Sequence, residues 1–419
     1  MKYKAVLASG VGLCLIAALA ACSSGSGSPQ SAGGPVTLTY WSGFTGGDRA
    51  TYESLIAEFN KTHPDIQVKM DEQPWDSLAQ KLPTALASGS GPDIATPDYN
   101  VGTIRQYIDN GLAAPIDELI GSGPDQIPAG ALPKTITDAF TVNGHLYAAP
   151  ANFATLMLYY NKDLLAAAHL TPPTTMQQLR DDAVKLTVKG QTYGIALADN
   201  NTIAMWPILI WADGGDIVKG NCSALSDPAT VAAVKSWADL IKNDGISPVG
   251  QSGQGADNLF AAKKAAFEIN GPWATGEYNG KVDYDVVPVP TGSSGTPVTL
   301  ASTVPMIVSA HTSHKAAALT FFAWWNGKTA QEGLAKGSGY PPSRTDMTGD
   351  PALAANPMVP KFAAAADTAR LYLPDQPKFN QIDTDIFSPA IQQATRGTDA
   401  KSALDSATSQ LNSLLGCSG

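Results

Sequence analysis

Aromatic and polar side chains gather where the sequence predicts strands to end. Trp41 closes the first predicted strand, Trp75 follows the second, and Asp98 and Tyr99 follow the third. Ligands of open α/β sheets collect at the carboxyl ends of the strands, so these side chains are expected to line one site. Aromatic rings stack on apolar faces, while carboxylates and amides hydrogen bond polar edges. That combination suits sugars, which have apolar C–H faces and hydroxyl groups along their edges.

The eight tryptophans divide into two groups. Core packing is the simplest role for the three inside predicted helices, which are Trp237, Trp324 and Trp325. The other five lie in or near strand ends and turns marked by Gly or Pro, and they are Trp41, Trp75, Trp206, Trp211 and Trp273. For any single one of these five, core packing is the alternative to ligand binding. The five together favour a binding surface.

Trp273 is the sharpest of these candidates. Residues 266–270 have the composition of a buried strand, and Gly271-Pro272 interrupts it. Proline cannot continue a central strand and Gly271 permits an unusual backbone angle, so Trp273 is expected to emerge at the strand's end. A helix or turn over 275–277 would support the indole from behind. We therefore predict that Trp273 is the main stacking platform for a sugar ring.

Signatures of common catalytic and metal sites are absent from the sequence. It contains no HExxH, GxSxG, GxGxxG, P-loop or CxxC motif. His311 and His314 have plausible metal-ligand spacing, but no carboxylate neighbours them, which favours a surface role at a helix start. We therefore expect no catalytic residue, no metal and no cofactor. A carboxylate pair assembled in space, as in glycoside hydrolases, stays open because spacing along the chain does not reveal it.

Composition and charge narrow the class further. The chain has 419 residues with a net charge of −10, and 44% of its residues are hydrophobic against 15% charged, which describes a globular protein. Phosphate contacts require Lys and Arg, so an acidic chain without basic clusters argues against a nucleic-acid partner. The length suits two lobes of ordinary domain size.

The N-terminal residues resemble an export signal. Two lysines precede an apolar, Ala-rich run over 5–21 that is too short for a comfortable membrane-spanning helix. The LAAC sequence at 19–22 resembles the bacterial lipobox, in which the cysteine is diacylated and becomes the new N-terminus. We expect 1–21 to be a lipoprotein signal peptide, Cys22 to carry the lipid, and 22–35 to be a Ser/Gly tether that holds an extracytoplasmic protein on the outer face of the cell membrane. Ordinary signal cleavage beside an incidental cysteine is the alternative.

Two of the four cysteines remain for the folded body. Cys14 leaves with the signal and Cys22 is assigned to the lipid, so Cys222 and Cys417 would meet the oxidising conditions outside the cytoplasm. We predict a disulfide between them. Two separate buried thiols are the alternative.

The N-terminal third alternates strands and helices. Residues 36–41 alternate as a strand, and Tyr52, Leu55, Ile56 and Phe59 have the i, i+3, i+4, i+7 spacing of an amphipathic helix. A strand over 66–70, a helix over 78–87 and a short buried strand over 93–96 follow. This order predicts an α/β fold with a parallel sheet and right-handed crossovers.

The rest of the chain shows helix start signals. A capping box opens a helix at Thr175, and Asp227-Pro228 has the residues preferred at an N-cap and first helical position. Two more helices are predicted over 314–325 and 399–415. These helices extend the α/β pattern.

Several stretches together resemble the extracellular solute-binding proteins of family 1, the carbohydrate-type receptors of ABC importers, related in architecture to maltose-binding proteins. The resemblance covers nearly everything from residue 36 to the C-terminal helix. It is carried by VTLTYWSGFTGGD, FNKTHPDIQV, ASGSGPDIA, NGHLYAAPANFATLMLYYNKDLL, MWPILIWADGGDI, AAFEINGPWA and GYPPSR. A single motif such as NGPW would be weak evidence for this resemblance, whereas the whole set in this order is specific for the family.

The resemblance implies a two-lobe α/β fold of the periplasmic-binding-protein type II class, with the ligand cleft between lobes joined by hinge crossings. We place these crossings near Pro150, Ser302 and Tyr340. Lobe 1 is then 36–149 with 303–341, and lobe 2 is 150–302 with 342–419. The resemblance also implies an open unliganded form and a closed liganded form. Its candidate ligand-binding residues are Trp41, Phe44, Thr45, Asp48, Trp75, Asp76, Asp98, Tyr99, Asn152, Phe153, Trp206, Trp211, Trp273, Ser302, Tyr340 and Arg344.

The function implied is that of a substrate-binding lipoprotein with no enzymatic activity. It would capture an oligosaccharide or related sugar as a monomer and deliver it to ABC permease subunits in the membrane. One alternative is a receptor for a phosphorylated polyol such as a glycerophosphodiester, with Arg344, Arg49 and Lys81 as candidate phosphate partners. A surface-anchored glycoside hydrolase is an alternative of another class.

Overall fold

The computed structural model describes residues 35–200, 205–347, 349–374 and 376–417. The expected signal peptide, Cys22 and nearly all of the tether lie outside these residues. Residues Pro35–Gly419 form one compact unit. Within the described ranges, no helix has the length and apolar character needed to cross a membrane.

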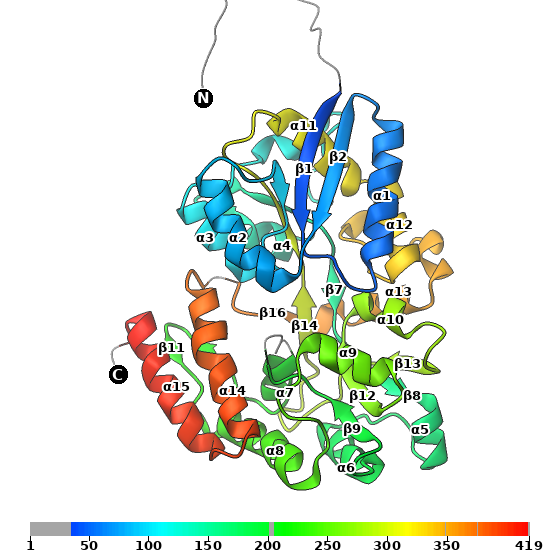
Figure 1. Cartoon of the computed structure of the whole chain (residues 1–419), viewed down its shortest axis with the longest axis vertical. Coiled ribbons are helices and arrows are strands. Elements are labelled where there is room, and N and C mark those ends of the chain that lie inside the picture. Colours follow the sequence, from blue (N-terminus) through cyan, green and yellow to red (C-terminus); the bar gives the residue numbers. More distant parts are fainter. Residues whose placement is uncertain (1–34, 201–204, 348, 375, 418–419) are drawn as a thin grey trace, which may run out of the picture. The chain divides into compact units, whose positions relative to one another are not determined.

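A five-stranded sheet organises the N-terminal part of the fold (Figure 1). In sheet order its strands are β2 (Ile66–Glu72), β1 (Val36–Ser42), β3 (Ile94–Ala95), β15 (Pro305–Val308) and β6 (Ala148–Pro150). The first three are parallel, as the alternation of strands and helices predicted, and β15 runs antiparallel to both of its neighbours.

Helices on this sheet bury the periodic apolar side chains that predicted them. The four residues expected to face inward from α1 are all buried, and they are Tyr52, Leu55, Ile56 and Phe59. The α-helices of this region are α1 (Arg49–Thr62), α2 (Trp75–Ala87), α3 (Ile104–Asp109), α4 (Lys134–Ala139), α11 (Lys315–Trp325) and α12 (Lys328–Ser338). Short elements complete it, namely η1 (Val101–Thr103), η2 (Asp117–Leu119), β4 (Thr141–Val142) and β5 (His145–Leu146).

A four-stranded sheet organises the second part. In sheet order its strands are β13 (Tyr284–Val287), β8 (Met157–Asn161), β12 (Ala265–Asn270) and β9 (Tyr193–Ala196). The predicted strand over 266–270 is therefore present as β12, and all of its residues are buried. It lies in the interior of the sheet, antiparallel to β8 and parallel to β9.

The helices around this sheet begin at the predicted signals. The capping box of α6 has both of its hydrogen bonds, and α8 has Asp227 as its N-cap residue with proline in the first turn. The α-helices of this region are α5 (Lys162–Ala167), α6 (Met176–Leu186), α7 (Met205–Ala212), α8 (Pro228–Asp244), α9 (Gly253–Ala261), α10 (Thr275–Tyr278), α14 (Ser388–Thr395) and α15 (Ala400–Leu415). Shorter elements are β10 (Val218–Lys219), β11 (Cys222–Ser223), η3 (Pro272–Ala274) and η7 (Gln381–Phe387).

A small three-stranded sheet lies along the path of the chain between the two larger sheets. Its order is β16 (Ala369–Leu371), β14 (Thr299–Ser302) and β7 (Ala154–Thr155). The chain leaves β6 for β7 through 151–153 and leaves β14 for β15 through 303–304. The remaining elements nearby are η4 (Thr345–Met347), η5 (Pro351–Ala355), α13 (Met358–Ala364) and η6 (Ala366–Thr368).

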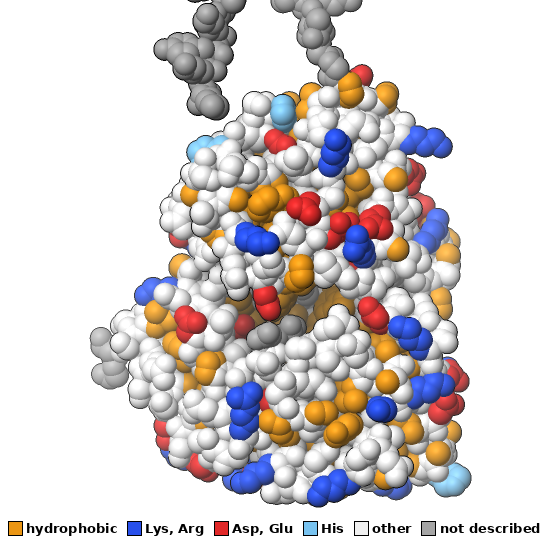
Figure 2. Space-filling model, in the orientation of Figure 1, with side chains coloured by type: hydrophobic (Ala, Val, Ile, Leu, Met, Phe, Trp, Pro, Cys, Tyr) orange, Lys and Arg blue, Asp and Glu red, His pale blue; other side chains and the backbone are white. Residues whose placement is uncertain are grey.

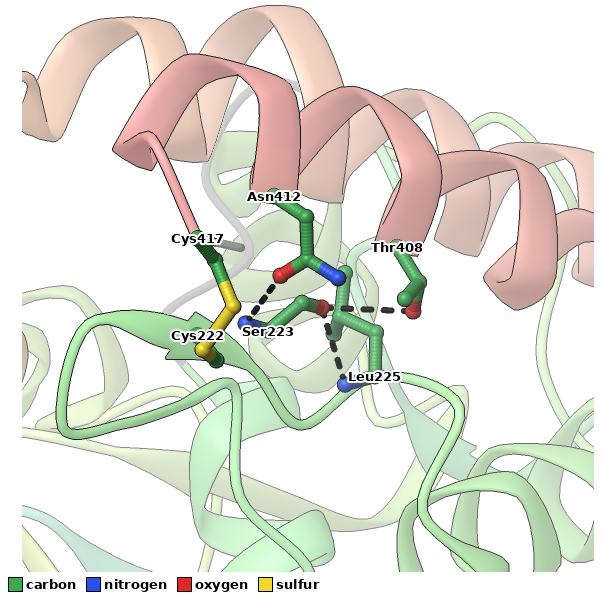
Figure 3. Close-up of a disulfide and its surroundings, with 6 residues drawn as sticks. All are labelled: Cys222, Ser223, Leu225, Thr408, Asn412 and Cys417. Carbon is green, nitrogen blue, oxygen red and sulfur yellow. Dashed lines mark hydrogen bonds between the residues drawn. A yellow bond between two sulfur atoms is a disulfide. The ribbon is translucent and has the colours of Figure 1, made fainter. Parts of the chain in front are cut away.

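A disulfide ties the C-terminal end of α15 to β11 (Figure 3). It joins Cys222 to Cys417, the pair expected from the sequence, with their Cα atoms 5.2 Å apart. Next to it, the backbone N–H of Ser223 donates to Asn412 Oδ1 at 2.7 Å, and the Ser223 hydroxyl lies 3.2 Å from that of Thr408. The last helix is therefore held to the second part of the fold by covalent and hydrogen bonds together.

Candidate functional site

A cavity of about 480 Å³ lies between residues that follow the strands of the two larger sheets. Figure 2 shows this face of the molecule hollowed between the upper and lower halves of the view, with hydrophobic atoms inside the hollow. Ten of the predicted ligand residues line the cavity, namely Phe44, Thr45, Asp48, Trp75, Asp76, Tyr99, Asn152, Trp273, Ser302 and Tyr340. Strand ends that are distant in the sequence therefore meet at one site, as expected for an open α/β fold.

Trp75 forms an aromatic wall on the side of the five-stranded sheet. It is the first residue of α2, and its ring lies directly over Gly43, where an added Cβ would come within 2.1 Å of the indole. The Phe44 ring meets Trp75 edge-on at 5.6 Å and stacks on Tyr52 at 3.8 Å, while Tyr99 meets Trp75 edge-on at 5.8 Å. Glycine is required at position 43 because any side chain would displace the indole.

Trp273 forms the corresponding wall on the side of the four-stranded sheet. It sits in η3 immediately after β12, is half-buried, and packs against three separate clusters of buried apolar residues. Gly271 does not adopt the unusual backbone angle expected from the sequence, since its φ of −99° and ψ of −179° are ordinary extended values. The glycine is needed for space, because a Cβ there would come within 2.1 Å of the Trp273 ring.

Asp48 and Tyr340 are hydrogen-bonded partners in the lining of the cavity. Asp48 precedes α1 and is buried, and the hydroxyl of Tyr340 donates to its Oδ2 at 2.8 Å. Burial raises the pKa of Asp48 to about 6, an effect that the hydrogen bond from Tyr340 partly offsets and the nearby Glu277 carboxylate reinforces. The carboxylate is consequently a strong acceptor that becomes protonated in mildly acidic solution.

Asn152 joins two crossing segments of the chain. Its Oδ1 accepts from the backbone N–H of Val304 at 3.2 Å, and its carbonyl oxygen accepts from the Thr303 hydroxyl at 2.8 Å. Its Nδ2 donates to the hydroxyl of Tyr52 at 2.9 Å. Asn152 therefore lines the cavity while its amide is used to hold the two crossings together.

The cavity also contains polar residues that the sequence analysis did not select. Asp257 of α9 and Glu268 and Asn270 of β12 lie on the same wall, and Asn270 Nδ2 donates to Asp257 Oδ1 at 2.7 Å and to Glu268 Oε1 at 3.2 Å. Ser252 and Gln254 line the cavity beside them. The available signal was Glu268 itself, a carboxyl group inside the otherwise apolar strand AAFEI.

Three predicted ligand residues lie in the interior instead. Trp206 has no exposed surface and donates its indole N–H to the carbonyl of Ala198 at 2.9 Å. Trp211 is also buried, donates to Asp216 at 2.9 Å and carries the Arg370 guanidinium 4.4 Å above its ring. Both belong to α7, a helix that is apolar on all sides, so its tryptophans pack in the core and do not line the cavity.

Arg344 is the third of these. It is buried, donates to both oxygens of Asp346 at 2.8 Å and to the carbonyl of Asn326 at 2.9 Å, and does not line the cavity. These donors are engaged by the Asp346 carboxylate and the Asn326 carbonyl, away from the cavity. The expected contact between Arg344 and a ligand is therefore not supported by its position.

The last three predicted residues lie near the cavity without lining it. Trp41 and Phe153 are half-buried against the core of the five-stranded sheet. Asp98 is half-buried and accepts from the backbone N–H of Asn100 at 2.9 Å. Burial raises the pKa of Asp98 to about 7, and the carboxylates of Asp383 and Asp76 contribute to the rise.

The described cavity lining is acidic and aromatic. It includes four carboxyl groups, and no Lys, Arg or His is among the residues that the structure describes there. Within the described part of the chain, no group of three or more His, Cys, Asp or Glu side chains is arranged to hold a metal ion. The arrangement can stack apolar faces and accept hydrogen bonds from several hydroxyl groups.

Comparisons with known proteins match most of the chain. The family model described as bacterial extracellular solute-binding protein matches residues 45–332. The galactooligosaccharide-binding protein of Bacillus subtilis is 28% identical over 382 residues, which cover 85% of this chain and 84% of that protein.

Solved structures share the fold. The GacH receptor of Streptomyces glaucescens, solved unliganded and in complex with acarbose, superposes with a TM-score of 0.82 at 24% identity, over 92% of this chain and all of that chain. UgpB from Mycobacterium tuberculosis, in complex with glycerophosphocholine, superposes with a TM-score of 0.80 at 21% identity, over 92% and 99% of the two chains.

Proposed function

The chain belongs to the bacterial extracellular solute-binding protein family, and from this membership we propose that it is the receptor of an ABC importer for an oligosaccharide or a related sugar. Its family and its two-lobe α/β fold of the periplasmic-binding-protein type II class are those predicted from the sequence. The sugar, its mode of capture and the assignment of individual residues are the proposal.

One observation carries this proposal: two indoles line a single cavity from opposite sheets. Trp75 and Trp273 each lie over a glycine that leaves room for the ring. A sugar ring would stack on such surfaces while Asp48, Asp257 and Gln254 accept or donate hydrogen bonds at its edges. The cavity volume of about 480 Å³ lies within the usual range of small-molecule sites, roughly 300–1,000 Å³. The galactooligosaccharide-binding relative is consistent with this ligand class.

The phosphorylated-polyol alternative is less well supported. UgpB shares the fold, but at 21% identity that likeness does not extend to the ligand. Recognition of a phosphate favours Arg or Lys, and the described lining of this cavity contains neither. Arg49 is exposed and paired with Glu53, and Arg344 is bonded to Asp346 outside the cavity. We therefore keep an uncharged sugar as the proposed ligand.

We also propose that the protein has no hydrolytic activity. Glycoside hydrolases keep their two carboxyl groups about 5 to 9.5 Å apart, so that a sugar or water fits between them. Asp257 and Glu268 are instead hydrogen bonded to one another, and Asp48 is held by Tyr340. The relatives compared above are binding proteins.

Ligand capture would involve closure of the two lobes about the crossing segments. Lobe 1 (36–149 and 303–341) and lobe 2 (150–302 and 342–419) are proposed with the boundaries given above. Residues after β1 touch residues after β12 at Gly47 and Gly276, where a Cβ on Gly276 would come within 2.4 Å of the Gly47 carbonyl oxygen. A sugar that contacts both walls would favour the form in which this contact is made.

Export and anchoring complete the proposal. The signal over 1–21 and the lipid on Cys22 would hold the receptor on the outer face of the cell membrane, close to the permease that receives the sugar. Mass spectrometry of the membrane-extracted protein would test this part. An N-terminal peptide that begins at Cys22 and carries acyl chains supports it, and an unmodified peptide contradicts it.

A ligand screen tests the proposed class of ligand. Residues 36–419 would be melted in the presence of glucose, galactose, maltose, maltotriose, galactooligosaccharides and glycerophosphocholine. A ligand at about a hundred times its dissociation constant stabilises the protein by about 2.7 kcal/mol, which shifts the melting temperature measurably. Stabilisation by an oligosaccharide supports the proposal, and stabilisation by glycerophosphocholine alone would replace it with the phosphorylated-polyol alternative.

A further inference from the structure

A buried polar cluster forms part of the cavity wall on β12, α9 and α10. Glu268 lies within the buried strand β12, and only 1% of its surface is exposed. The hydroxyl of Tyr278 donates to its Oε2, and Asn270 Nδ2 lies 3.2 Å from its Oε1. Asp257 is hydrogen bonded to Glu268 and accepts from Asn270 at 2.7 Å.

Two carboxyl groups in such contact cannot both be ionised in a buried site, because two negative charges at short range repel strongly where water does not screen them. One proton between them removes the repulsion and supplies a strong O–H···O hydrogen bond. Burial raises the pKa of Glu268 well above its ordinary value, and the Asp257 carboxylate raises it further. Glu268 is the more deeply buried of the two, so the proton belongs with Glu268 and the negative charge with Asp257.

The neighbouring Asn270 side chain is engaged by the protein itself. The Asn270 amide nitrogen donates to Asp257, Glu268 and Tyr278, and the Asn270 Oδ1 accepts from the backbone N–H of Gly271 at 2.8 Å. Asp257 keeps acceptor capacity, since a carboxylate offers about four lone-pair sites, and it lines the cavity.

We infer that Glu268 is a positioning residue of the ligand site: it shares one proton with Asp257 and so holds the Asp257 carboxylate where it accepts a hydrogen bond from a hydroxyl group of the ligand. This inference rests on the proposed function, because it assigns the polar contact that the sugar makes with this wall. It goes further by making sugar binding dependent on a proton that the protein itself retains.

The surroundings of the pair favour retention of that proton. The groups that act electrostatically on the pair include Tyr159 of β8 and both Glu277 and Tyr278 of α10. Each of these side chains is either neutral or negatively charged, so none of them stabilises a second negative charge on the pair. Among the described residues, the strongest influences on the two carboxyl groups include no cation. In alkaline solution the proton is lost, the two carboxylates repel, and Asp257 is displaced from its position.

Binding measurements on two substitutions of Glu268 test the inference, with maltotriose and galactooligosaccharides as probes between about pH 7 and 10. For the wild type, the dissociation constant is expected to rise by up to about tenfold per pH unit above the apparent pKa of the pair. Glu268→Gln keeps a neutral donor of the same shape, so it should lose this pH dependence and bind more tightly at neutral pH than a variant without the donor. Glu268→Ala should bind about tenfold or more weakly at neutral pH, because Asp257 is no longer held.

Asp383→Asn is the matched control, since Asp383 is another buried acid with a raised pKa that does not line the cavity. It should keep the wild-type pH profile of binding. Wild-type affinity in Glu268→Ala, or a wild-type alkaline profile in Glu268→Gln, would overturn the inference. Melting temperatures of all variants identify any loss of folding, and rescue by Gln but not Ala separates positioning from a merely structural role.

Infrared spectroscopy of the ligand-free protein tests the shared proton without any sugar. At about pH 8 the wild type and Asp383→Asn should show the C=O stretch of a protonated carboxyl group, and Glu268→Gln should lack it. A wild-type spectrum without that band overturns the inference. If the band behaves as expected but no probe sugar binds, the ligand contact fails together with the proposed function, and the shared proton stands.

Discussion

Truncation of Trp273 separates the two roles that a tryptophan at this position can have. Its indole lines the cavity and also packs, half-buried, against the cores of both larger sheets. Trp273→Ala is therefore expected to weaken sugar binding and to destabilise the fold. Trp237 is the matched control, because it is fully buried in α8 and does not line the cavity.

The magnitudes follow from burial and contact. Removing a fully buried Trp costs about 3–5 kcal/mol of folding free energy, which is the expectation for Trp237→Ala. Removing a half-buried indole should cost roughly half as much folding free energy, so Trp273→Ala should destabilise the protein by about 1.5–2.5 kcal/mol. An aromatic residue at the centre of a binding site contributes roughly 2–4 kcal/mol, which corresponds to a rise of about 30- to 1,000-fold in the dissociation constant.

The assay combines denaturant unfolding with calorimetric titration of the sugar identified by melting. Trp273→Ala should lose most of its affinity while remaining folded at the assay temperature, and Trp237→Ala should lose more stability and bind the sugar normally when folded. A folded Trp273→Ala protein with wild-type affinity would refute the stacking role. Equal losses of affinity in both variants would show that affinity merely follows stability.

Three further perturbations have distinct expected outcomes. Gly276→Ala places a methyl group against the Gly47 backbone and should weaken sugar binding severalfold or more. The control Gly292→Ala makes a similar clash with Ala212 inside lobe 2 and should lower only the melting temperature. Equal sugar affinities of the two variants would contradict closure of the lobes on the ligand. Cys417→Ser should lower the free energy of unfolding by up to about 5 kcal/mol in the chain-entropy model, and unchanged unfolding in denaturant would contradict this. Because the folded-state pKa of Asp48 is raised from 3.8 to about 6, its contribution to stability is full below the unfolded pKa and is lost as pH rises through the folded pKa. From about pH 4 to 7 the wild type should lose about 2 kcal/mol of folding free energy relative to Asp48→Asn. Parallel stability curves for the two proteins would contradict the raised pKa of Asp48.

Local sequence patterns predicted the elements that depend on near neighbours. The helical spacing of Tyr52 and Phe59 gave α1, and the capping residues around Thr175 gave α6, because helix periodicity and N-cap bonds involve residues a few positions apart. Apolar strands broken by Gly and Pro predicted β12 and the emergence of Trp273 after it. The cysteine pairing followed from the exclusion of the two N-terminal cysteines.

Local patterns could not predict whether an aromatic side chain faces the core or the ligand cavity. Trp206 and Trp211 lie in a helix that is apolar all round, so no periodicity distinguished a core face from a ligand face. The structure buries both and brings Trp75 and Trp273 together across the cavity instead. Such placement depends on how two sheets pack, which involves contacts between residues hundreds of positions apart.

The polar chemistry of the site was likewise decided by tertiary structure. Glu268 belongs to an apolar strand and Asp257 to a helix, and neither has a motif that links it to the other. The fold places them in hydrogen-bonding contact under Tyr278, and burial there changes what their carboxyl groups do. The sequence by itself determined family, fold class and which strand ends carry aromatic residues, because those depend on order and local pattern. Which side chains face the cavity, and in what protonation state, depends on desolvation and on partners that only the folded chain brings together.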